Sequence, residues 1–382
     1  MPSFASTTIL ISALSIILGL YLIQPADMPS FAAIRAANAA FFRSVSGAGS
    51  SSSSSAAATA NAATNAASNT NTNNDLPTAV FVGGTSGIGE GMAVTFAEHT
   101  EGKSNIILVG RNRAAAERIL ASLPAPPPSL SPAPAREFVQ CDATLIKNVH
   151  SASSQILSKF PKINYLIITA GFSTLAGRDE TPEGIDKKLA VHYYARWKFL
   201  SDLVPGLQKA KEAGEEAVAM SVMAAGKGGK VDLEDLGLKR GYSLSAAALA
   251  APTYNDLMVE SFAEKYPSLR FIHAYPGFVR TNLGASSPST TLRLLTPVAL
   301  GLFRPLSVSQ NECGEYMWYA VSHTIRDGSS NTTAGKTGAF RTGSKGEDLG
   351  RKGYYGSEEA RRRLWAHTVE TVQAALGKEE GK

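Results

Sequence analysis

A cluster of glycines between two apolar stretches constrains the fold of this chain more than any other feature. The cluster, residues 83–89, reads GGTSGIG; it follows the apolar, β-forming run 78–82 and opens a helix-like stretch at 88–99. This pattern predicts a tight turn between a buried strand and a helix. The N–H groups at such a helix N-terminus can hold a pyrophosphate, and glycine lets the backbone approach it closely. The sequence therefore predicts a dinucleotide-binding turn, with a purely structural turn as the alternative.

The glycine spacing, Gly83-x-x-x-Gly87-x-Gly89, resembles the turn of the short-chain dehydrogenase/reductase family, whose pattern is T-G-x-x-x-G-[IL]-G. Val82 stands where that family usually has threonine. The resemblance extends over about residues 77–321 and implies that the turn binds a dinucleotide. The turn residues that would contact the dinucleotide are Gly83, Thr85, Ser86, Gly87, Ile88 and Gly89.

Beyond the turn, strand-like and helix-like stretches alternate. This alternation predicts a single α/β domain with a doubly wound parallel sheet, a Rossmann fold. A chain of 382 residues with 44% hydrophobic side chains can supply a sizeable core. The net charge of +5 is mild and no basic stripe is interleaved with aromatic residues, so we expect no nucleic-acid partner. Cys141 and Cys313 lie in no metal-ligand spacing, so we expect no metal site.

The end of the second expected strand, 105–109, indicates which dinucleotide the chain prefers. NAD-specific sites usually place an acid near this point to bind the ribose hydroxyls. Here Gly110 is followed by Arg111 and Arg113, with no acid nearby. Arginine suits a 2′-phosphate through its charge and its paired donors. We therefore expect NADP(H) to be preferred over NAD(H); the alternative is that the two arginines are simply a charged helix start.

The resemblance implies further cofactor contacts at the ends of later strands. Asp142 follows the third expected strand, where the family binds adenine, although this residue could instead cap the next helix. Ala170 and Gly171 follow the fourth strand, in keeping with a close approach of backbone and cofactor. The family motif that closes over the nicotinamide amide is matched by Pro276, Gly277, Val279 and Thr281.

The catalytic positions of the family are only partly kept. Its Tyr-x-x-x-Lys pair lies on one helical face, where the lysine lowers the pKa of the tyrosine and grips the nicotinamide ribose. Here the tyrosine is Tyr242, and Ala246 stands at the lysine position. We expect Tyr242 to lie on this helix and to donate the proton. Charge could be lent from a nearby loop by Lys227, Lys230, Lys239 or Arg240.

Two further catalytic positions of the family are changed. The serine position is Met223, which cannot donate a hydrogen bond, and Ser221 could serve only if the strand end were shifted. The relay asparagine position, on a long helix expected at 184–211, is His192. A histidine can hold a water or a proton, although a lone histidine on a packed helix is more often structural. Tyr242, Ser221 and His192 are therefore the candidate catalytic residues.

The first 75 residues differ in composition from the rest. Residues 1–27 contain the apolar run Thr7–Ile23, an anchor or signal-like segment at the short end for a membrane span. The pentapeptide that opens the chain recurs at 28–32, so translation could begin at the second copy. Residues 28–75 are amphipathic at first and then a low-complexity tether. The amphipathic part fits a mitochondrial presequence or, equally, a helix packed on the domain through Phe31, Ile34, Phe41 and Phe42. We expect a cytoplasmic location, with a membrane tether if the apolar run is retained, or a mitochondrial one.

Residues 76–382 form the expected domain, with a substrate lid at about 282–305 and a last helix at about 357–377. The lid is apolar, which fits a hydrophobic carbonyl substrate or, equally, packing or a partner surface. We therefore expect an NADPH-dependent oxidoreductase that reduces a small hydrophobic ketone or aldehyde. The alternatives are a dinucleotide-binding or scaffold protein with impaired catalysis, and a dehydratase, epimerase or isomerase. The resemblance also suggests a homodimer or homotetramer.

Overall fold

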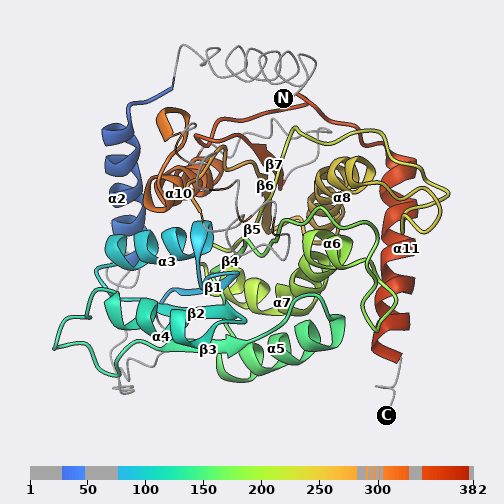
Figure 1. The fold of residues 1–382 in the computed structure, drawn as a ribbon. Helices are drawn as coiled ribbons and strands as arrows, with labels where there is room; N and C mark the ends of the chain where they lie inside the picture. Colours follow the sequence, from blue (N-terminus) through green and yellow to red (C-terminus); the bar gives the residue numbers. More distant parts are fainter. Residues whose placement is uncertain are drawn as a thin grey trace, which may run out of the picture.

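The computed structural model describes residues 28–47, 76–281, 304–326 and 338–377, together with the single residues 290, 293, 296 and 301. Within these residues the chain forms a seven-stranded sheet in the order β3-β2-β1-β4-β5-β6-β7, with helices on both faces (Figure 1). All neighbouring strands are parallel. This is the doubly wound arrangement, so the predicted fold class is confirmed.

The strands are short, and those at the centre of the sheet are apolar. They are β1 (Thr78–Val82), β2 (Asn105–Gly110), β3 (Arg136–Gln140), β4 (Tyr165–Ile168), β5 (Val218–Val222), β6 (Arg270–Ala274) and β7 (Ala339–Thr342). Every residue of β1, β4, β5 and β7 is buried, because helices cover both faces of the sheet. Successive side chains point to opposite faces, so Val80 packs in the core on one side of the sheet and Phe81 in the core on the other.

Two layers of helices bury these two cores. The layer on the side of Phe81 consists of α3 (Gly87–His99), α4 (Arg113–Ser122) and α10 (Gln310–Arg326). The layer on the side of Val80 consists of α5 (Ile146–Lys159), α7 (Ala195–Glu212) and α8 (Leu244–Lys265). The last helix, α11 (Glu358–Gly377), packs against α5 and α8 and lies close to the range expected for it. A single 3₁₀ turn, η3 (Arg304–Leu306), precedes α10.

The long helix expected at 184–211 is present as a continuous helical run from 187 to 212, but it is not regular throughout. A short helix, α6 (Lys187–Leu189), begins after Asp186, whose carboxylate accepts hydrogen bonds from the first N–H groups of the helix. A π-helical turn, η2 (Ala190–Tyr194), then leads into α7. Such turns widen a helix locally and free a carbonyl group for a partner outside it, which period-based reasoning does not detect.

Contacts from two other helices hold this wide turn. The carbonyl oxygen of His192 accepts a hydrogen bond from Asn255 Nδ2 of α8 at 2.8 Å. On the opposite side, two tyrosine hydroxyls of the turn contact α11, Tyr193 with Thr368 and Tyr194 with His367, each at 2.7 Å. The segment that carries His192 is therefore fixed between α8 and α11.

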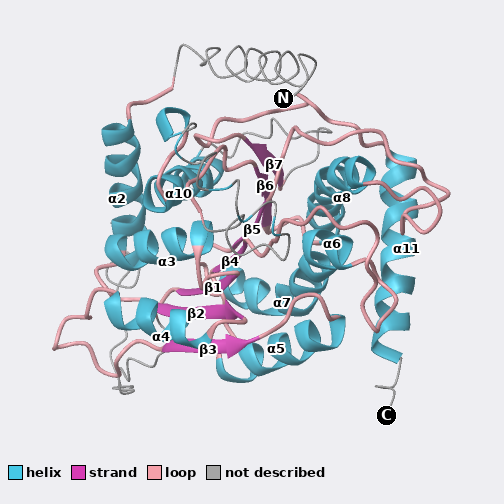
Figure 2. Cartoon of the chain, in the orientation of Figure 1, coloured by secondary structure: helices cyan, strands magenta, loops and turns pink. Residues whose placement is uncertain are grey.

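The N-terminal helix α2 (Phe31–Gly47) packs against α3 and α10 (Figure 2). Phe42 is 1% exposed, and its ring lies edge-on to the rings of Phe96 and Trp318. Ile34 and Phe41 are buried as well. The structure thus shows the helix packed on the domain, which was one of the two alternatives for this segment.

The apolar segment 1–27 and the tether after α2 lie outside the described residues. Among the helices that the structure does describe, none combines the length and the apolar character that a membrane crossing requires.

The buried carboxylate of Glu315, on α10, ties α2 to the domain. Its oxygens accept hydrogen bonds from Arg35 and Asn38 of α2 and lie within hydrogen-bond distance of His99 on α3, at 2.7 to 3.1 Å. Burial alone would raise the pKa of this carboxyl, but the hydrogen bonds from His99, Asn38 and Arg35 and the charge of His99 hold that pKa below its usual range.

We expect Glu315→Gln to reduce stability in a pH-dependent way. Because the folded-state pKa lies below the unfolded one, the carboxylate stabilises the fold above its unfolded pKa and loses that effect as the pH falls through the folded value. The variant should lose about 2 kcal/mol of unfolding free energy at neutral pH. The difference should shrink below about pH 4. Denaturant unfolding at a series of pH values measures this; a difference that does not change with pH would contradict it.

Candidate active site

A cavity of about 490 Å³ opens where the carboxyl ends of the central strands meet. It lies where the strand order reverses between β1 and β4, the place at which doubly wound sheets bind ligands. Residues from the turns after β1, β2, β3, β4, β5 and β6 contribute to its wall. The cavity therefore brings together segments that are almost two hundred residues apart in the sequence.

The glycine turn forms one wall of this cavity, through Gly83, Thr85, Ser86, Gly87 and Ile88. Gly83 has a φ of 86°, and a Cβ there would lie 2.6 Å from the Ala170 nitrogen, so the turn and the end of β4 touch through bare backbone. Ser86 precedes α3 without a side-chain cap, which leaves the first N–H groups of the helix free for an anion. These features fit a pyrophosphate.

Gly89, the remaining residue predicted in the turn, does not line the cavity. A Cβ on Gly89 would lie 2.5 Å from the carbonyl oxygen of Gly83. Glycine at this position therefore allows α3 to pack closely against the turn. It does not contribute to the surface that a ligand would contact.

The two arginines after β2 lie in different places. Arg111 lines the cavity. Arg113 is the first residue of α4 and does not line it; its guanidinium lies over the ring of Phe138 at 5.0 Å and 3.8 Å from Glu117. Arg113 is therefore a charged residue at the start of a helix, which was the alternative interpretation. Arg111 lies where it can contact a ligand in the cavity. No acidic side chain from the end of β2 lines the cavity.

Asp142 lines the cavity beside Cys141 and Thr144. One oxygen of its carboxylate accepts hydrogen bonds from the nitrogen and the hydroxyl of Thr144, at 3.0 and 2.9 Å. The helix that follows, α5, is capped instead by the distant Glu183, which accepts from the nitrogens of its first two residues. Asp142 thus orders a local turn while it lines the cavity. The capping of α5 by Glu183 was not predicted from the sequence.

The end of the cavity farther from Arg111 and Asp142 lies at the ends of β4, β5 and β6. It is lined by Ala170 and Gly171, expected to approach the cofactor through their backbone, and by the residues expected over the nicotinamide, Pro276, Gly277, Val279 and Thr281. His192 and Met223 line the same end. Burial and the nearby cations Arg196 and Lys188 lower the pKa of His192 to about 3. His192 is therefore a neutral imidazole at neutral pH, whose Nε2 lies 3.4 Å from the backbone nitrogen of Phe172.

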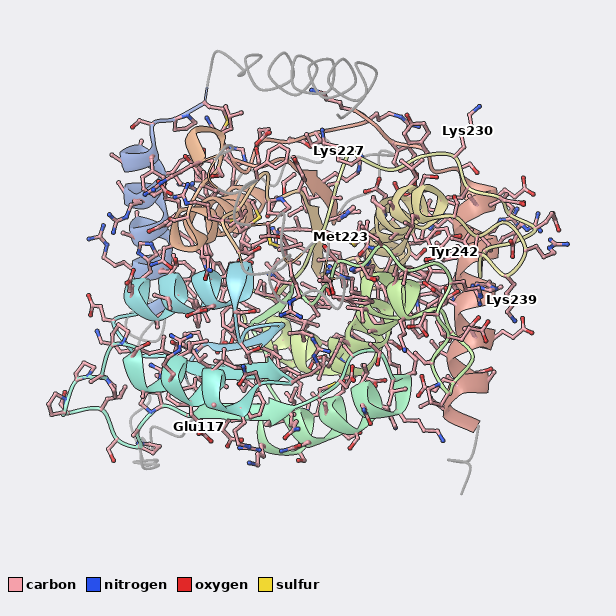
Figure 3. The ribbon with its side chains drawn as sticks, viewed as in Figure 1. Glu117, Met223, Lys227, Lys230, Lys239 and Tyr242 are labelled. Atoms are coloured by element: carbon pink, nitrogen blue, oxygen red, sulfur yellow. The ribbon has the colours of Figure 1, made fainter. Side chains whose placement is uncertain are left out.

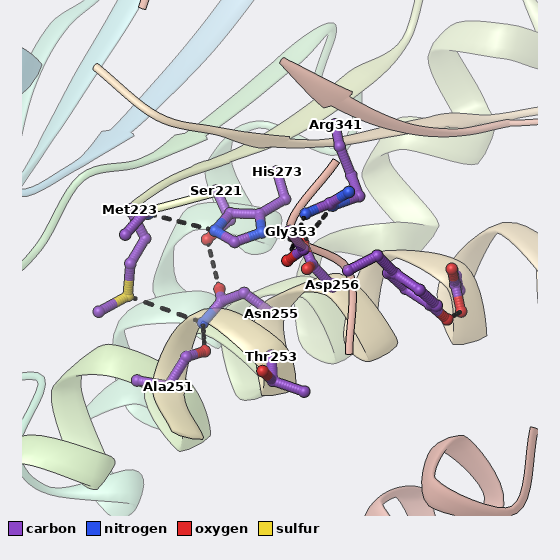
Figure 4. Close-up of polar contacts among 12 residues, drawn as sticks. Ser221, Met223, Ala251, Thr253, Asn255, Asp256, His273, Arg341 and Gly353 are labelled. Carbon is purple, nitrogen blue, oxygen red and sulfur yellow. Dashed lines mark hydrogen bonds and ion pairs between the residues drawn. The ribbon is translucent and has the colours of Figure 1, made fainter. Parts of the chain in front are cut away.

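Ser221 does not reach the cavity. β5 ends at Val222, directly before Met223, so the shifted strand end that a role for Ser221 requires is not seen. The Ser221 hydroxyl is buried, donates to Asn255 Oδ1 and accepts from Arg196, both at 2.7 Å. Figure 4 shows Ser221 and Met223 both directed at Asn255, whose amide lies 3.7 Å from the Met223 sulfur.

Tyr242 lies outside the predicted helix and outside the cavity lining, which corrects the expectation that it sits on a helical face. α8 begins at Leu244, and Ser243 caps it through a bond from the Ala246 nitrogen. The Tyr242 hydroxyl accepts a hydrogen bond from Lys188 Nζ at 2.7 Å. Figure 3 places Tyr242 beside α6 and α8, away from Met223 at the centre of the molecule.

Lys188 supplies the charge that was expected from the loop lysines. It lies one helical turn before His192, and its amine also donates to the carbonyl oxygens of Ala176 and Gly177. Of the lysines proposed from the sequence, Lys227 instead lies over the ring of Tyr275 at 5.1 Å. Sequence reasoning missed Lys188 because it is 54 residues from Tyr242; its spacing of four from His192 was the available signal.

Arg196 is the second cation that sequence reasoning missed. It is 2% exposed and lines the cavity at the ends of β4 and β5. Its guanidinium donates to the carbonyl oxygens of Ile168, Ala170 and Val222, at 2.6 to 3.1 Å. Burial lowers its pKa to about 9, so it stays positively charged at neutral pH.

The fold and the cavity together define a Rossmann-type dinucleotide-binding protein. A family model described as short chain dehydrogenase matches residues 77–291. The chain is 36% identical over 246 residues to oxidoreductase AN1596 of Emericella nidulans, covering 64% of this chain and 71% of that protein. It is 30% identical over 325 residues to oxidoreductase andH of Emericella variicolor, covering 79% and 93%.

Among solved structures, a protein from Mycobacterium paratuberculosis has a similar fold, with a TM-score of 0.51 and 17% identity over 79% of this chain and 97% of that one. The chain therefore belongs to the short-chain dehydrogenase/reductase family, and its class is that of an oxidoreductase. The family expected from the glycine turn is confirmed.

Proposed function

We propose that this protein is an NADPH-dependent oxidoreductase that reduces a small hydrophobic ketone or aldehyde. The observation that carries the proposal is the contact of 2.7 Å between Lys188 Nζ and the hydroxyl of Tyr242. It restores, from two separate elements, the lysine–tyrosine pair that the sequence pattern lacks. Lys188, one member of the pair, lies one helical turn before His192, which lines the cavity.

In this proposal the dinucleotide, when bound, supplies a hydride to the carbonyl carbon. The N–H groups at the start of α3 hold the pyrophosphate, and Arg111 holds the 2′-phosphate. Tyr242 gives its proton to the carbonyl oxygen, so that one hydride and one proton convert the carbonyl to an alcohol. All three hydrogens of the Lys188 ammonium are directed at oxygens, and its charge stabilises the phenolate that remains.

Apolar side chains support a hydrophobic substrate. Phe172, Val191 and Met223 line the cavity near His192. Leu175 and Leu244 are 53% and 37% exposed. Leu175 precedes Ala176, whose carbonyl oxygen contacts Lys188, and Leu244 follows Tyr242 by two residues. The apolar lid expected at 282–305 falls largely outside the described residues and remains part of the proposal. The cytoplasmic location and the homo-oligomer expected from the sequence stay predictions.

Arg111→Gln is expected to weaken NADPH binding by about tenfold or more and to leave NADH binding nearly unchanged, because only NADPH carries a phosphate for this side chain. Calorimetric titration of the full chain with each dinucleotide measures both affinities. Arg113→Gln is the matched control, since Arg113 does not line the cavity. Equal losses for both dinucleotides in Arg111→Gln would contradict the assignment of Arg111 to the 2′-phosphate.

The reaction itself is tested by following NADPH consumption by the full chain with ketones and aldehydes graded in size and polarity. We expect consumption that depends on added substrate and is fastest for apolar carbonyls. NADPH binding without any turnover would mean a dinucleotide-binding protein that has lost catalysis. A product with the oxidation state of its substrate would instead favour a dehydratase, epimerase or isomerase.

A further inference from the structure

Arg196 is a buried cation inside the cavity for which the proposed hydride transfer has no use. Its four hydrogen-bond acceptors are three backbone carbonyls and the hydroxyl of Ser221, all of them uncharged. Within the described part of the chain, no carboxylate lies at ion-pair distance from it. A buried charge without a counter-ion is costly, which favours a functional role for this guanidinium.

The donors of Arg196 are directed away from any ligand. Nη1 donates to Ile168, Ser221 and Val222, and Nη2 donates to Ala170, while Nε is buried without a partner. Arg196 therefore acts on the cavity through its electrostatic field rather than through a direct hydrogen bond.

The charge of Arg196 lies at one particular end of the cavity. Ala170 and Val222, whose carbonyls hold the guanidinium, line the same end of the cavity as Gly171, Met223 and Pro276. This is the end assigned to the nicotinamide. Arg111 and Asp142 follow β2 and β3, at the opposite, adenine end, and His192 beside Arg196 is neutral. Among the described residues that line the cavity, Arg196 is therefore the one that keeps a permanent charge at the nicotinamide end, while Lys188, whose charge also reaches His192, lies outside the lining.

We propose that Arg196 makes this protein select the reduced dinucleotide over the oxidised one. The oxidised nicotinamide ring carries a positive charge and the reduced ring is neutral, so a fixed cation beside the ring penalises the oxidised form alone. The inference rests on the proposed function only in requiring that a nicotinamide dinucleotide binds here. Its consequence is that NADP⁺, once formed, is readily displaced by NADPH, so that the cavity reloads for reduction.

The expected selectivity is about tenfold or more in affinity, the size of the interaction between two unit charges roughly 10 Å apart at an effective dielectric constant of about 20. For a two-electron couple, tenfold tighter binding of the reduced form shifts the potential of the bound couple by about +30 mV. The bound dinucleotide is thus a slightly weaker hydride donor, in exchange for faster replacement of the product.

The test is a set of dissociation constants for the full chain, measured by calorimetry with NADPH, NADP⁺, NADH and NAD⁺. We expect each reduced form to bind about tenfold or more tightly than its oxidised partner. The ratio of reduced to oxidised affinity, within the NADP pair or within the NAD pair, does not depend on the 2′-phosphate. Equal affinities for NADPH and NADH would therefore overturn the assignment of Arg111 and leave the proposal for Arg196 untouched. Oxidised forms that bind as tightly as reduced forms would overturn the selection by Arg196.

Two variants locate the effect. Arg196→Gln, which removes the charge, should clearly lower the ratio of reduced to oxidised affinity, whereas Arg196→Lys should keep most of it. Arg111→Gln, at the far end of the cavity, is the matched control and should weaken NADPH and NADP⁺ equally. A folded Arg196→Gln variant that keeps the wild-type ratio would overturn the proposal.

A second measurement on the wild-type chain covers the case in which Arg196→Gln does not fold. The probe is 2′-phospho-ADP-ribose, which has every group of NADP⁺ except the cationic ring. We expect it to bind at least as tightly as NADP⁺, because the ring is penalised by Arg196. Clearly tighter binding of NADP⁺ than of this probe would contradict a repulsive cation at the nicotinamide end.

Discussion

Tyr242→Phe is expected to lower kcat for carbonyl reduction by about a hundredfold or more and to leave the affinity for NADPH nearly unchanged. The phenylalanine keeps the ring and removes only the hydroxyl that Lys188 contacts at 2.7 Å. Since the pair lies outside the lining of the dinucleotide cavity, binding should not depend on it. Steady-state kinetics with an accepted ketone, together with calorimetry for NADPH, separate the two effects.

Lysine variants on α6 provide the matched comparison. Lys188→Met should reduce kcat to a similar extent, because it removes the charge that stabilises the phenolate. Lys187→Met should leave kcat unchanged, because the Lys187 amine is 2.8 Å from the exposed Asp179 carboxylate and does not contact Tyr242. Unchanged turnover in Tyr242→Phe would assign the proton to another donor. Lys188 would then act only by supporting the loop at Ala176 and Gly177, whose carbonyl oxygens it contacts.

Phe42→Ala is expected to cost about 3–5 kcal/mol of unfolding free energy. The ring is 1% exposed and meets the rings of Phe96, Tyr165 and Trp318 at centroid distances of 5.1 to 6.2 Å. Truncation would leave a cavity among rigid aromatic neighbours that cannot collapse to fill it. Chemical denaturation of the full chain measures the loss.

Phe31→Ala serves as the control on the same helix. Phe31 is only partly buried, and among the described residues its ring meets that of Tyr316 at 5.5 Å, so the loss should be clearly smaller. Equal, small losses for the two variants would mean that α2 does not share the core of the domain. That outcome would favour the alternative in which this segment serves as a targeting sequence.

The fold was predictable because its signals are local. The bounds of β1 and β5 agree residue for residue with the apolar runs 78–82 and 218–222, since buried parallel strands are continuous apolar segments. The glycine turn was recognisable because Gly83 and Gly87 adopt positive φ angles that other residues rarely accept. Most of the cofactor residues followed from the family pattern around these strands, and the cavity gathers them.

The catalytic part was less predictable because it depends on contacts between distant segments. Lys188 meets Tyr242 only because α6 packs beside the start of α8. Ser221 was a candidate by spacing, but its hydroxyl is taken by Arg196 and Asn255, two residues from other helices. The π turn at His192 depends in the same way on partners in α8 and α11, which no periodicity along one helix reveals.

The most direct test of the proposed reaction is to incubate the full chain with NADPH deuterated at the transferable position and an apolar ketone that the chain consumes. We expect mass spectrometry to find one deuterium on the carbinol carbon of the product. Product formation should fall in parallel with kcat in Tyr242→Phe. A chain that binds NADPH tightly yet forms no deuterated alcohol from any of the apolar carbonyls would contradict the proposal of a carbonyl reductase.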